Sequence, residues 1–152
     1  MLVRFLGLEE EALAESHRMH MPFTDVNPNH APYIAMLYAL GLTHGTTATT
    51  FSPKVEVQAR DYMTFMLRVL GYEEGVGEFA WATAVEDGLR LGILDAAEYT
   101  ELTTAPFDRG RMACVSLTVL QAQDREGNLL ADTLTERGIL SEKKVSEFLE
   151  KN

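Results

Sequence analysis

The segment from Phe23 to Gly71 most constrains the fold, because it reads as one complete unit of helix, loop and helix. Fragments of the same unit occur on either side of it. The stretch RFLGLEE at 4–10 resembles RVLGYEE at 68–74, and the ending ALGL at 39–42 returns as RLGIL at 90–94 and ERGIL at 136–140. A repeat of about 50 residues built from paired helices buries little surface alone and must pack against its neighbours. The pattern predicts a binding scaffold rather than a catalyst.

Composition is typical of a folded domain with an acidic balance of charge. Of the 152 residues, 46% are hydrophobic and 24% are charged, so a packed core is expected and a wholly disordered chain is excluded. The formal net charge of -10 comes from 13 Lys and Arg residues against 23 Asp and Glu residues. Because nucleic acid is bound through clustered cations, we expect no nucleic-acid partner, and an acidic ligand would need a local basic pocket.

Cysteine content and hydropathy set further limits. Cys114 has no partner for an intrachain disulfide and lies in a helical pattern, so core packing is its expected role. Runs of 18 apolar residues are absent from the sequence, so we expect no membrane span, and no export signal is recognisable at Met1. The sequence LVRFLG at 2–7 has the pattern of the end of an amphipathic helix, which indicates a piece of a longer protein.

Glycine and proline positions predict an all-α fold. Helices are expected over residues 1–18 with a break at Gly7, from near Pro32 to Gly41, over 57–70 up to Gly71, over 79–91 up to Gly92, over 109–123, and in a hairpin that turns at Gly138. Residues 42–56 and 95–108 are predicted to be loops, the first held to the helices by Phe51 and Pro53. Alternation with period two is absent from the sequence, so no sheet is expected.

Four stretches of the central unit carry a family resemblance. They are FTDV at 23–26, PYIAMLYALG at 32–41, FSP at 51–53 and MLRVLGY at 66–72. In this order they resemble the S-layer homology domain, a bacterial cell-surface module. The family pattern runs F-x-D-V, a P-Y-I helix ending in Gly, F-x-P, and a helix that opens T-R-A-E and ends R-x-L-G. Residues 21–72 resemble one complete repeat, 1–20 the end of a preceding one, and 79–123 a degenerate following one.

The resemblance implies both an architecture and a function. Over 1–152 it implies a single domain in which tandem helix-loop-helix repeats pack as a pseudo-threefold bundle, with a terminal helical hairpin at 128–152. Grooves between the repeats of this family hold acidic, often pyruvylated, secondary cell-wall polysaccharide, which anchors the protein noncovalently. A secreted, cell-surface or cell-wall location follows from the same resemblance, and no cofactor is expected.

The family's T-R-A-E motif, which holds the polysaccharide, is altered in this chain. In the central repeat it reads QARD, with Ala59 at the family's Arg position, Arg60 one position later and Asp61 at the acid position. A shift of one residue rotates a helical side chain by about 100°, which would aim Arg60 away from a groove. In the third repeat the motif reads DRGR, with Arg109 retained and Arg111 replacing the acid.

Arg109 is the better placed cation of the altered motifs. Asp108 can cap the helix that follows it, and this leaves the Arg109 guanidinium beside the helix N-terminus, where free N–H groups also favour an anion. The alternative is that Arg60 and Arg111 are solvated charges and that Arg109 pairs with an acid. Trp81, at the start of the third-repeat helix, is either a stacking platform for a sugar ring or a packing residue.

Other candidate sites have less support. The spacing of His17 and His20 suits a pair of metal ligands, but a third ligand is missing, so a metal site is not expected. The DVNPN run from Asp25 resembles the start of a calcium loop, yet His30 and Met36 stand where such a loop needs Gly and Glu. A turn and helix cap is predicted there instead. Motifs of the common enzyme classes are absent from the sequence, so enzyme activity is the least supported class.

The sequence therefore predicts a helical repeat protein that binds acidic cell-wall polysaccharide and is not an enzyme. The candidate glycan-binding residues are Asp108, Arg109, Arg111, Arg60, Asp61 and Trp81. The competing interpretation is a helical protein–protein interaction or self-assembly domain. In that case the incomplete repeats at both ends would pair with another copy of the chain or with neighbouring repeats.

Overall fold

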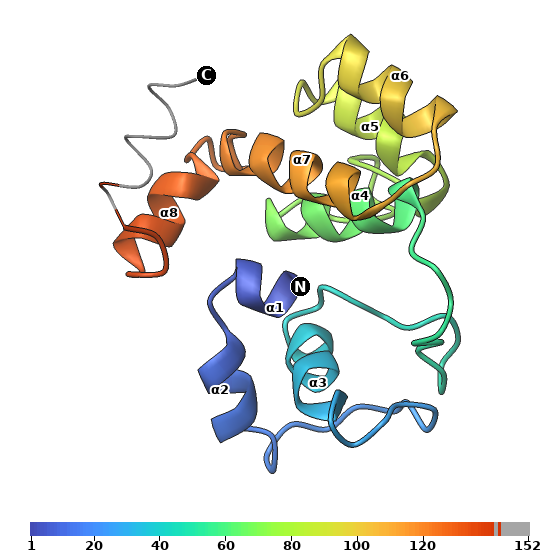
Figure 1. The fold of residues 1–152 in the computed structure, drawn as a ribbon, viewed down its shortest axis with the longest axis vertical. Coiled ribbons are helices and arrows are strands. Elements are labelled where there is room, and N and C mark those ends of the chain that lie inside the picture. The colour runs from blue at the N-terminus through green and yellow to red at the C-terminus, as the bar shows by residue number, and fades with distance from the viewer. Residues whose placement is uncertain (142, 144–152) are drawn as a thin grey trace. The chain divides into compact units, whose positions relative to one another are not determined.

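The fold is given by a computed structural model that describes residues 1–141 and 143 (Figure 1). This part of the chain is helical and has no β-strand, only isolated bridges from Glu74 to Phe79 and from Gln123 to Leu129. The prediction of an all-α protein is confirmed. The chain divides into two compact units, Met1–Glu56 and Val57–Asn152, called unit 1 and unit 2. The pseudo-threefold arrangement and the repeat boundaries stay predictions.

Unit 1 contains the helices α1 (Leu2–Phe5), α2 (Glu9–Ala14) and α3 (Ala31–Ala39). Both α1 and α2 pack against α3. Pro32 lies in the first turn of α3, as predicted, because a residue at that position needs no N–H for the helix ladder. The buried side chains of the unit include Leu8, Ala12, Phe23 and Ile34.

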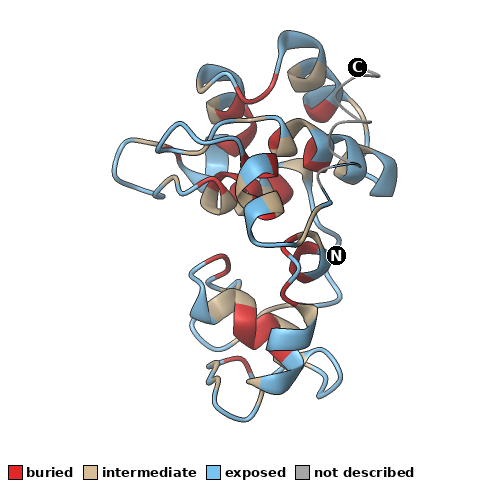
Figure 2. Cartoon of the chain, turned by 90° about the vertical axis from the view of Figure 1, so that its left-hand side faces the viewer, coloured by how far each residue is buried: buried red, intermediate tan, exposed pale blue. Residues whose placement is uncertain are grey.

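Unit 2 is arranged around α4 (Ala59–Val69). Along the chain there follow the 3-10 turn η1 (Trp81–Thr83), α5 (Ala84–Arg90), α6 (Ala96–Thr104), α7 (Arg109–Leu120) and α8 (Leu130–Glu136). α4 packs against α5 and α7, while α6 packs on α5 and α8 on α7. Met63, Met66 and Leu67 of α4 are fully buried, and Figure 2 shows buried residues inside each unit. Flexible Met side chains fill irregular gaps in a core, so the Met-rich run needs no ligand to explain it.

Five helices end in the same way at the glycines predicted from the sequence. Gly7, Gly41, Gly71, Gly92 and Gly138 all have a positive φ, between 68° and 82°. After each glycine, the next N–H donates to the carbonyl five residues earlier, as from Leu42 to Leu37 at 2.8 Å. This is the Schellman cap, in which glycine takes the left-handed conformation without steric cost. The glycine in each of these repeated stretches therefore marks a helix end.

In both RFLGLEE and RVLGYEE the arginine pairs with a glutamate after the glycine, although with the first glutamate in one stretch and the second in the other. Arg4 pairs with Glu9 at 2.8 Å across the first of these caps, and Arg68 pairs with Glu74 across the third. The Arg4 side chain is 75% exposed, whereas that of Arg68 is 12% exposed. Similar sequences therefore form a solvent-exposed ion pair in unit 1 and a largely buried ion pair in unit 2.

The prediction that residues 95–108 form a loop is wrong, because α6 lies within them. Asp95 Oδ1 accepts the N–H of Glu98, and Glu98 Oε2 accepts the N–H of Asp95, both at 2.8 Å. This capping box starts the helix. Its threonines remain helical by donating to carbonyls one turn earlier, as Thr100 does to Ala96 at 2.7 Å. The D-x-x-E spacing outweighs the Thr content that indicated a loop.

Three other predictions also need correction. The helix predicted over 79–91 begins as a 3-10 turn and becomes α5 only at Ala84, because Ala80 is extended. Cys114 is exposed on α7 rather than packed in the core. Pro53 is exposed and does not anchor its loop, whereas Phe51 contacts the buried ring of Phe23 with centroids 5.7 Å apart.

Two helix ends and the terminal hairpin complete the comparison with the sequence. α4 begins two residues after the predicted Val57, and α7 ends three residues before the predicted limit at 123. The hairpin predicted over 128–152 has its first helix in α8 and its turn at Gly138, and most of its second half, 142 and 144–152, lies outside the described residues. Within the described part of the chain, every helix is too short or too polar to cross a membrane.

Candidate functional site

The starts of α4 and α7 lie at the same end of unit 2. The two helices are packed side by side and run in the same direction (Figure 1). Tyr62, in the first turn of α4, contacts Phe107, which directly precedes the α7 cap, with ring centroids 5.7 Å apart. Its hydroxyl group lies 2.7 Å from Ser116 Oγ, and burial raises the pKa of Tyr62. The altered QARD and DRGR motifs therefore begin neighbouring helices.

The QARD motif forms the first turn of α4. Gln58 is the cap residue, and its backbone N–H donates to Asp61 Oδ2 at 2.9 Å, as in a capping box. The other oxygen, Asp61 Oδ1, accepts the indole N–H of Trp81 at 2.8 Å. The guanidinium carbon of Arg60 lies 4.1 Å from the centre of the Trp81 ring, within the range of a cation–π interaction. The structure thus brings Arg60, Asp61 and Trp81 together.

Trp81 is held at its edge and remains open to solvent. The residue is 44% exposed, so it is not a core packing residue. Its backbone N–H donates to Glu74 Oε1 at 3.3 Å, and Glu74 also pairs with Arg68. An indole fixed in this way and partly exposed has the form of a platform for a flat apolar surface. Its role in binding a sugar stays a prediction.

The DRGR motif forms the start of α7. Asp108 is the predicted cap, and its Oδ1 accepts the N–H of Arg111 at 2.9 Å. That hydrogen bond, aided by the charge of Arg111, lowers the pKa of Asp108. Arg109 occupies the first helical position and is exposed. Within residues 1–141 and 143, the Arg109 guanidinium has no ion pair or hydrogen bond, so the alternative of an acid partner is not seen there.

Arg111 has the opposite surroundings. Its Nη1 donates to the carbonyl of Pro106 at 2.9 Å and to Asp108 Oδ2 at 3.2 Å, and its Nη2 pairs with Glu101 Oε1 at 3.2 Å. The side chain is 24% exposed, and its buried Nε lacks a partner among the described residues. The guanidinium is therefore engaged by the protein. Direct glycan binding by Arg111 stays a prediction.

The F-x-D and F-x-P stretches form a second organised region, within unit 1. Asp25 accepts the backbone N–H of Phe51 through Oδ1 and that of Ser52 through Oδ2, each at 2.8 Å. These two hydrogen bonds lower the pKa of Asp25. Sequence reasoning assigned Asp25 to a turn and helix cap and missed this longer-range contact. The sequence signal that could have indicated this contact was the presence of both motifs, F-x-D before α3 and F-x-P after it.

Phe23 packs against the same loop from the protein interior. Its buried ring lies 5.3 Å from Tyr38 of α3, edge to face, as well as against Phe51. Gly45 has a φ of +75°, and a Cβ atom there would come within 2.4 Å of the Phe23 ring. Glycine is therefore required at this position by both its conformation and its close approach. Phe51 thus contacts Phe23, which in turn contacts α3, and its role in holding the loop to the helices stays a prediction.

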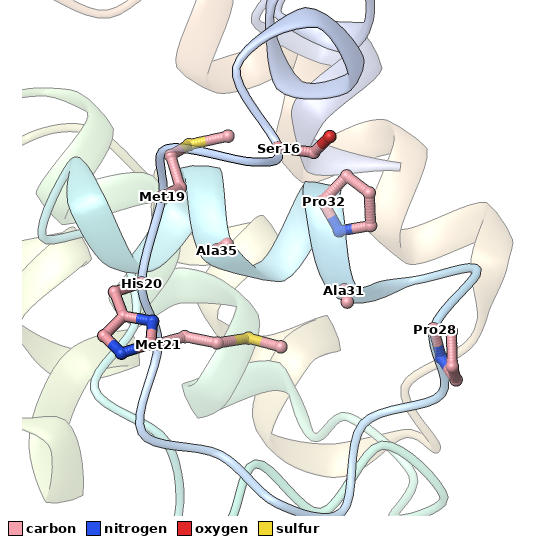
Figure 3. Close-up of a pocket in the computed structure, with 8 residues that line it drawn as sticks. All are labelled: Ser16, Met19, His20, Met21, Pro28, Ala31, Pro32 and Ala35. Atoms are coloured by element: carbon pink, nitrogen blue, oxygen red, sulfur yellow. The ribbon is translucent and has the colours of Figure 1, made fainter.

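A pocket of about 350 Å³ also lies in unit 1, between residues 16–21 and the first part of α3 (Figure 3). Its lining is mainly apolar and includes Met19, Met21 and Pro32. His20 lines this pocket and His17 does not, so the two histidines are not gathered there. In the described part of the chain, no three His, Cys, Asp or Glu side chains are grouped so as to hold a metal ion.

Comparison with known proteins finds a family match in one segment of the chain. The sequence model of the S-layer homology domain matches residues 22–57, the segment that contains Phe23, Asp25 and the loop they hold. The resemblance predicted from the sequence is confirmed over these residues. Domains of this family are in general cell-wall anchoring domains of surface proteins.

One relative extends the similarity beyond this segment. A cell surface protein of Thermoanaerobacter kivui is 37% identical over 76 residues, which cover 48% of this chain and 10% of that protein. The chain thus spans about a tenth of the length of this curated relative. No solved structure matches the chain.

Proposed function

We propose that this chain anchors a surface protein to the cell wall by binding an acidic, pyruvylated wall polysaccharide noncovalently. The observation that carries the proposal is the exposed Arg109 at the first position of α7. Asp108 already accepts the N–H of Arg111 at this helix start, and the positive end of the helix dipole beside Arg109 favours an anion. The Arg109 guanidinium adds two parallel donors that suit the carboxylate of a pyruvyl group.

The surface formed by Trp81, Arg60 and Asp61 supports the same function. The exposed indole offers an apolar face for a sugar ring, Arg60 adds positive charge, and Asp61 fixes the edge of the ring. Because α4 and α7 begin at the same end of unit 2, a polymer that carries repeated acidic groups has two neighbouring motifs to contact. The net charge of -10 repels such a polymer, so binding depends on short-range contacts at these residues.

The family match supports a location at the cell surface. The matched domain is one that anchors proteins at the cell surface, and the curated relative carries the name of a cell surface protein. We propose the same location, the cell surface or the cell wall, for this chain. The role is binding rather than catalysis.

The test is cosedimentation of the purified chain with cell-wall sacculi, with and without their acidic polysaccharide. The chain should bind intact sacculi and lose binding to stripped ones. Arg109→Ala should weaken binding about tenfold to a hundredfold, because a charge-assisted hydrogen bond contributes about 1.5–3 kcal/mol. Arg137→Ala, which removes the same charge from an exposed position after α8, is the matched control and should change binding little.

A conservative variant refines this test. Arg109→Lys should restore part of the binding, since an ammonium keeps the charge but lacks the flat two-donor geometry. If the parent chain does not bind sacculi, or if Arg109→Ala binds as well as the parent, the assembly interpretation is favoured. That interpretation predicts a concentration-dependent dimer in sedimentation equilibrium, and the exposed Cys114 and Leu117 of α7 are the first residues to test for it.

A further inference from the structure

We propose that Arg111 and Glu101 form a positioning pair that orients Arg109, and that Arg111 does not itself bind the glycan. The proposal rests on the proposed function, because it concerns the site at the start of α7. Its basis is a contrast between two arginines that are two positions apart in the sequence. Arg109 is exposed with no partner in the described part of the chain, whereas Arg111 is held by three neighbouring groups.

The Arg111 guanidinium ties the end of α6 to the start of α7. Nη2 pairs with Glu101 Oε1 at 3.2 Å, and Glu101 lies in the last turn of α6. Nη1 donates at 2.9 Å to the carbonyl of Pro106, in the connection between the two helices. Because proline fixes its own φ angle, a bond to its carbonyl restrains a segment that already has little freedom. The direction in which the chain enters α7 is set by these contacts.

The same guanidinium also restrains the cap residue. Asp108 Oδ2 accepts from Arg111 Nη1 at 3.2 Å, while Asp108 Oδ1 accepts from the Arg111 backbone N–H at 2.9 Å. Both carboxylate oxygens are thus held by one residue. Arg109 follows the cap directly, so its Cα–Cβ bond takes its direction from this restrained backbone. The Nε of Arg111 is buried, and its Nη1 and Nη2 already contact Pro106, Asp108 and Glu101, so a ligand would compete with these contacts.

For the substitution Glu101→Gln, the proposal predicts a change in glycan affinity opposite in sign to the change expected from electrostatic repulsion alone. Glu101→Gln removes a negative charge near an anion site, so electrostatic repulsion alone predicts tighter binding of an acidic polysaccharide. Positioning predicts binding weaker by about twofold to fivefold, the loss expected for one partly exposed ion pair. Glu126→Gln is the matched control, since it removes the same charge from an exposed turn beyond the other end of α7 and should change binding little.

The experiment measures the affinity of the parent, Glu101→Gln, Glu126→Gln, Arg109→Gln and Arg111→Gln for isolated acidic wall polysaccharide. Measurements are made well below the melting temperature of each variant, so that unfolding does not contribute. Arg109→Gln should weaken binding and reduce its salt dependence, because a ligand-facing charge is lost. Arg111→Gln should weaken binding and leave the salt dependence unchanged.

Two results would overturn the positioning pair. One is a Glu101→Gln affinity equal to or higher than that of Glu126→Gln. The other is a loss of salt dependence in Arg111→Gln as large as that in Arg109→Gln, which would make Arg111 a direct ligand of the polymer.

A parent chain that binds no wall polysaccharide would refute the proposed function and still leave the pair testable. Hydrogen exchange of the Arg111 backbone amide, which Asp108 caps, should be faster in Glu101→Gln than in Glu126→Gln. Equal exchange rates in the two variants would then overturn the proposal.

Discussion

The starts of α4 and α7 show that one helix-start geometry can present two different surfaces. In both, the cap residue is extended and the third helical residue bonds to it. In α4 that residue is Asp61, whose carboxylate accepts the backbone N–H of Gln58. In α7 it is Arg111, whose backbone N–H and guanidinium both donate to Asp108. The acid and its donor have exchanged places while the capping geometry is kept.

The two helix starts also differ in the position of the arginine that is not part of the cap. In α4 the cation is Arg60, at the second helical position, and it lies over the Trp81 ring. In α7 it is Arg109, at the first position, and it faces solvent. One residue along a helix is a rotation of about 100°, so a shift of one position converts an exposed donor into a stacked one. Cation position, rather than net charge, distinguishes the two surfaces.

The largest expected effect on stability comes from substituting Tyr62, which connects the starts of α4 and α7. Tyr62 is buried, contacts Phe107 before the α7 cap, and lies within hydrogen-bonding distance of Ser116. Tyr62→Ala should reduce the free energy of unfolding by about 3–5 kcal/mol, the usual cost of removing a buried aromatic ring. Urea unfolding followed by circular dichroism measures this loss.

Tyr62→Phe separates the ring from its hydroxyl group. It keeps the contact with Phe107 and should cost only about 0.5–1.5 kcal/mol, since Ser116 Oγ still donates to the Met112 carbonyl at 2.8 Å. If Tyr62→Ala costs no more than Tyr62→Phe, the two helix starts are not coupled through this ring.

Moving the cation by one position sharpens the comparison. In the double variant Ala59→Arg with Arg60→Ala, the central repeat regains the cation order of α7 with an unchanged net charge. Binding to acidic wall polysaccharide should strengthen by up to about tenfold, because a stacked charge becomes a free donor at the first helical position. Arg60→Ala alone is the control and should not strengthen binding. Equal binding by both variants would show that cation position has no effect at α4.

The described helix ends were largely predictable from the sequence because they depend on local chemistry. Gly41, Gly71 and Gly92 each end a helix with a left-handed backbone, and this requirement is visible in single residues. The prediction of a loop over 95–108 was wrong because a second local signal was overlooked. Asp95 and Glu98 form a local capping box, and the abundance of threonine concealed that signal.

The candidate site was less predictable because its contacts join distant segments. The residues Arg60, Asp61 and Trp81 were singled out from the sequence, but the hydrogen bond from Trp81 to Asp61 spans 20 residues. The same is true of Asp25, which holds the backbone at Phe51 and Ser52. Glu101 was missed because its segment was taken for a loop. A sequence pattern can single out such residues, but their contact partners are known only once the chain has folded.

A smaller effect is expected when Asp61 is removed. Asp61→Ala loses both the hydrogen bond from Gln58 and the indole hydrogen bond, and it should destabilise unit 2 by roughly 1 kcal/mol. Trp81 is the single tryptophan of the chain, so its fluorescence reports on this site alone. Its emission should shift to longer wavelength as the indole becomes more hydrated. Asp132→Ala, in the first turn of α8, is the control, and equal emission in the two variants would show that Asp61 does not hold the ring.

The smallest effect concerns the charge on Asp108. Its pKa lies below the ordinary value of 3.8, chiefly because it accepts the Arg111 N–H, so its ionised form is favoured by folding. The stability that this charge contributes is present above pH 3.8 and disappears as the pH falls through the lowered value. Asp108→Asn keeps a capping oxygen and removes only the charge. The urea midpoint of the parent should therefore exceed that of Asp108→Asn slightly at pH 7, and the two should converge at acid pH. A difference that stays constant across this range would mean that the shape of the cap, and not its charge, holds the start of α7.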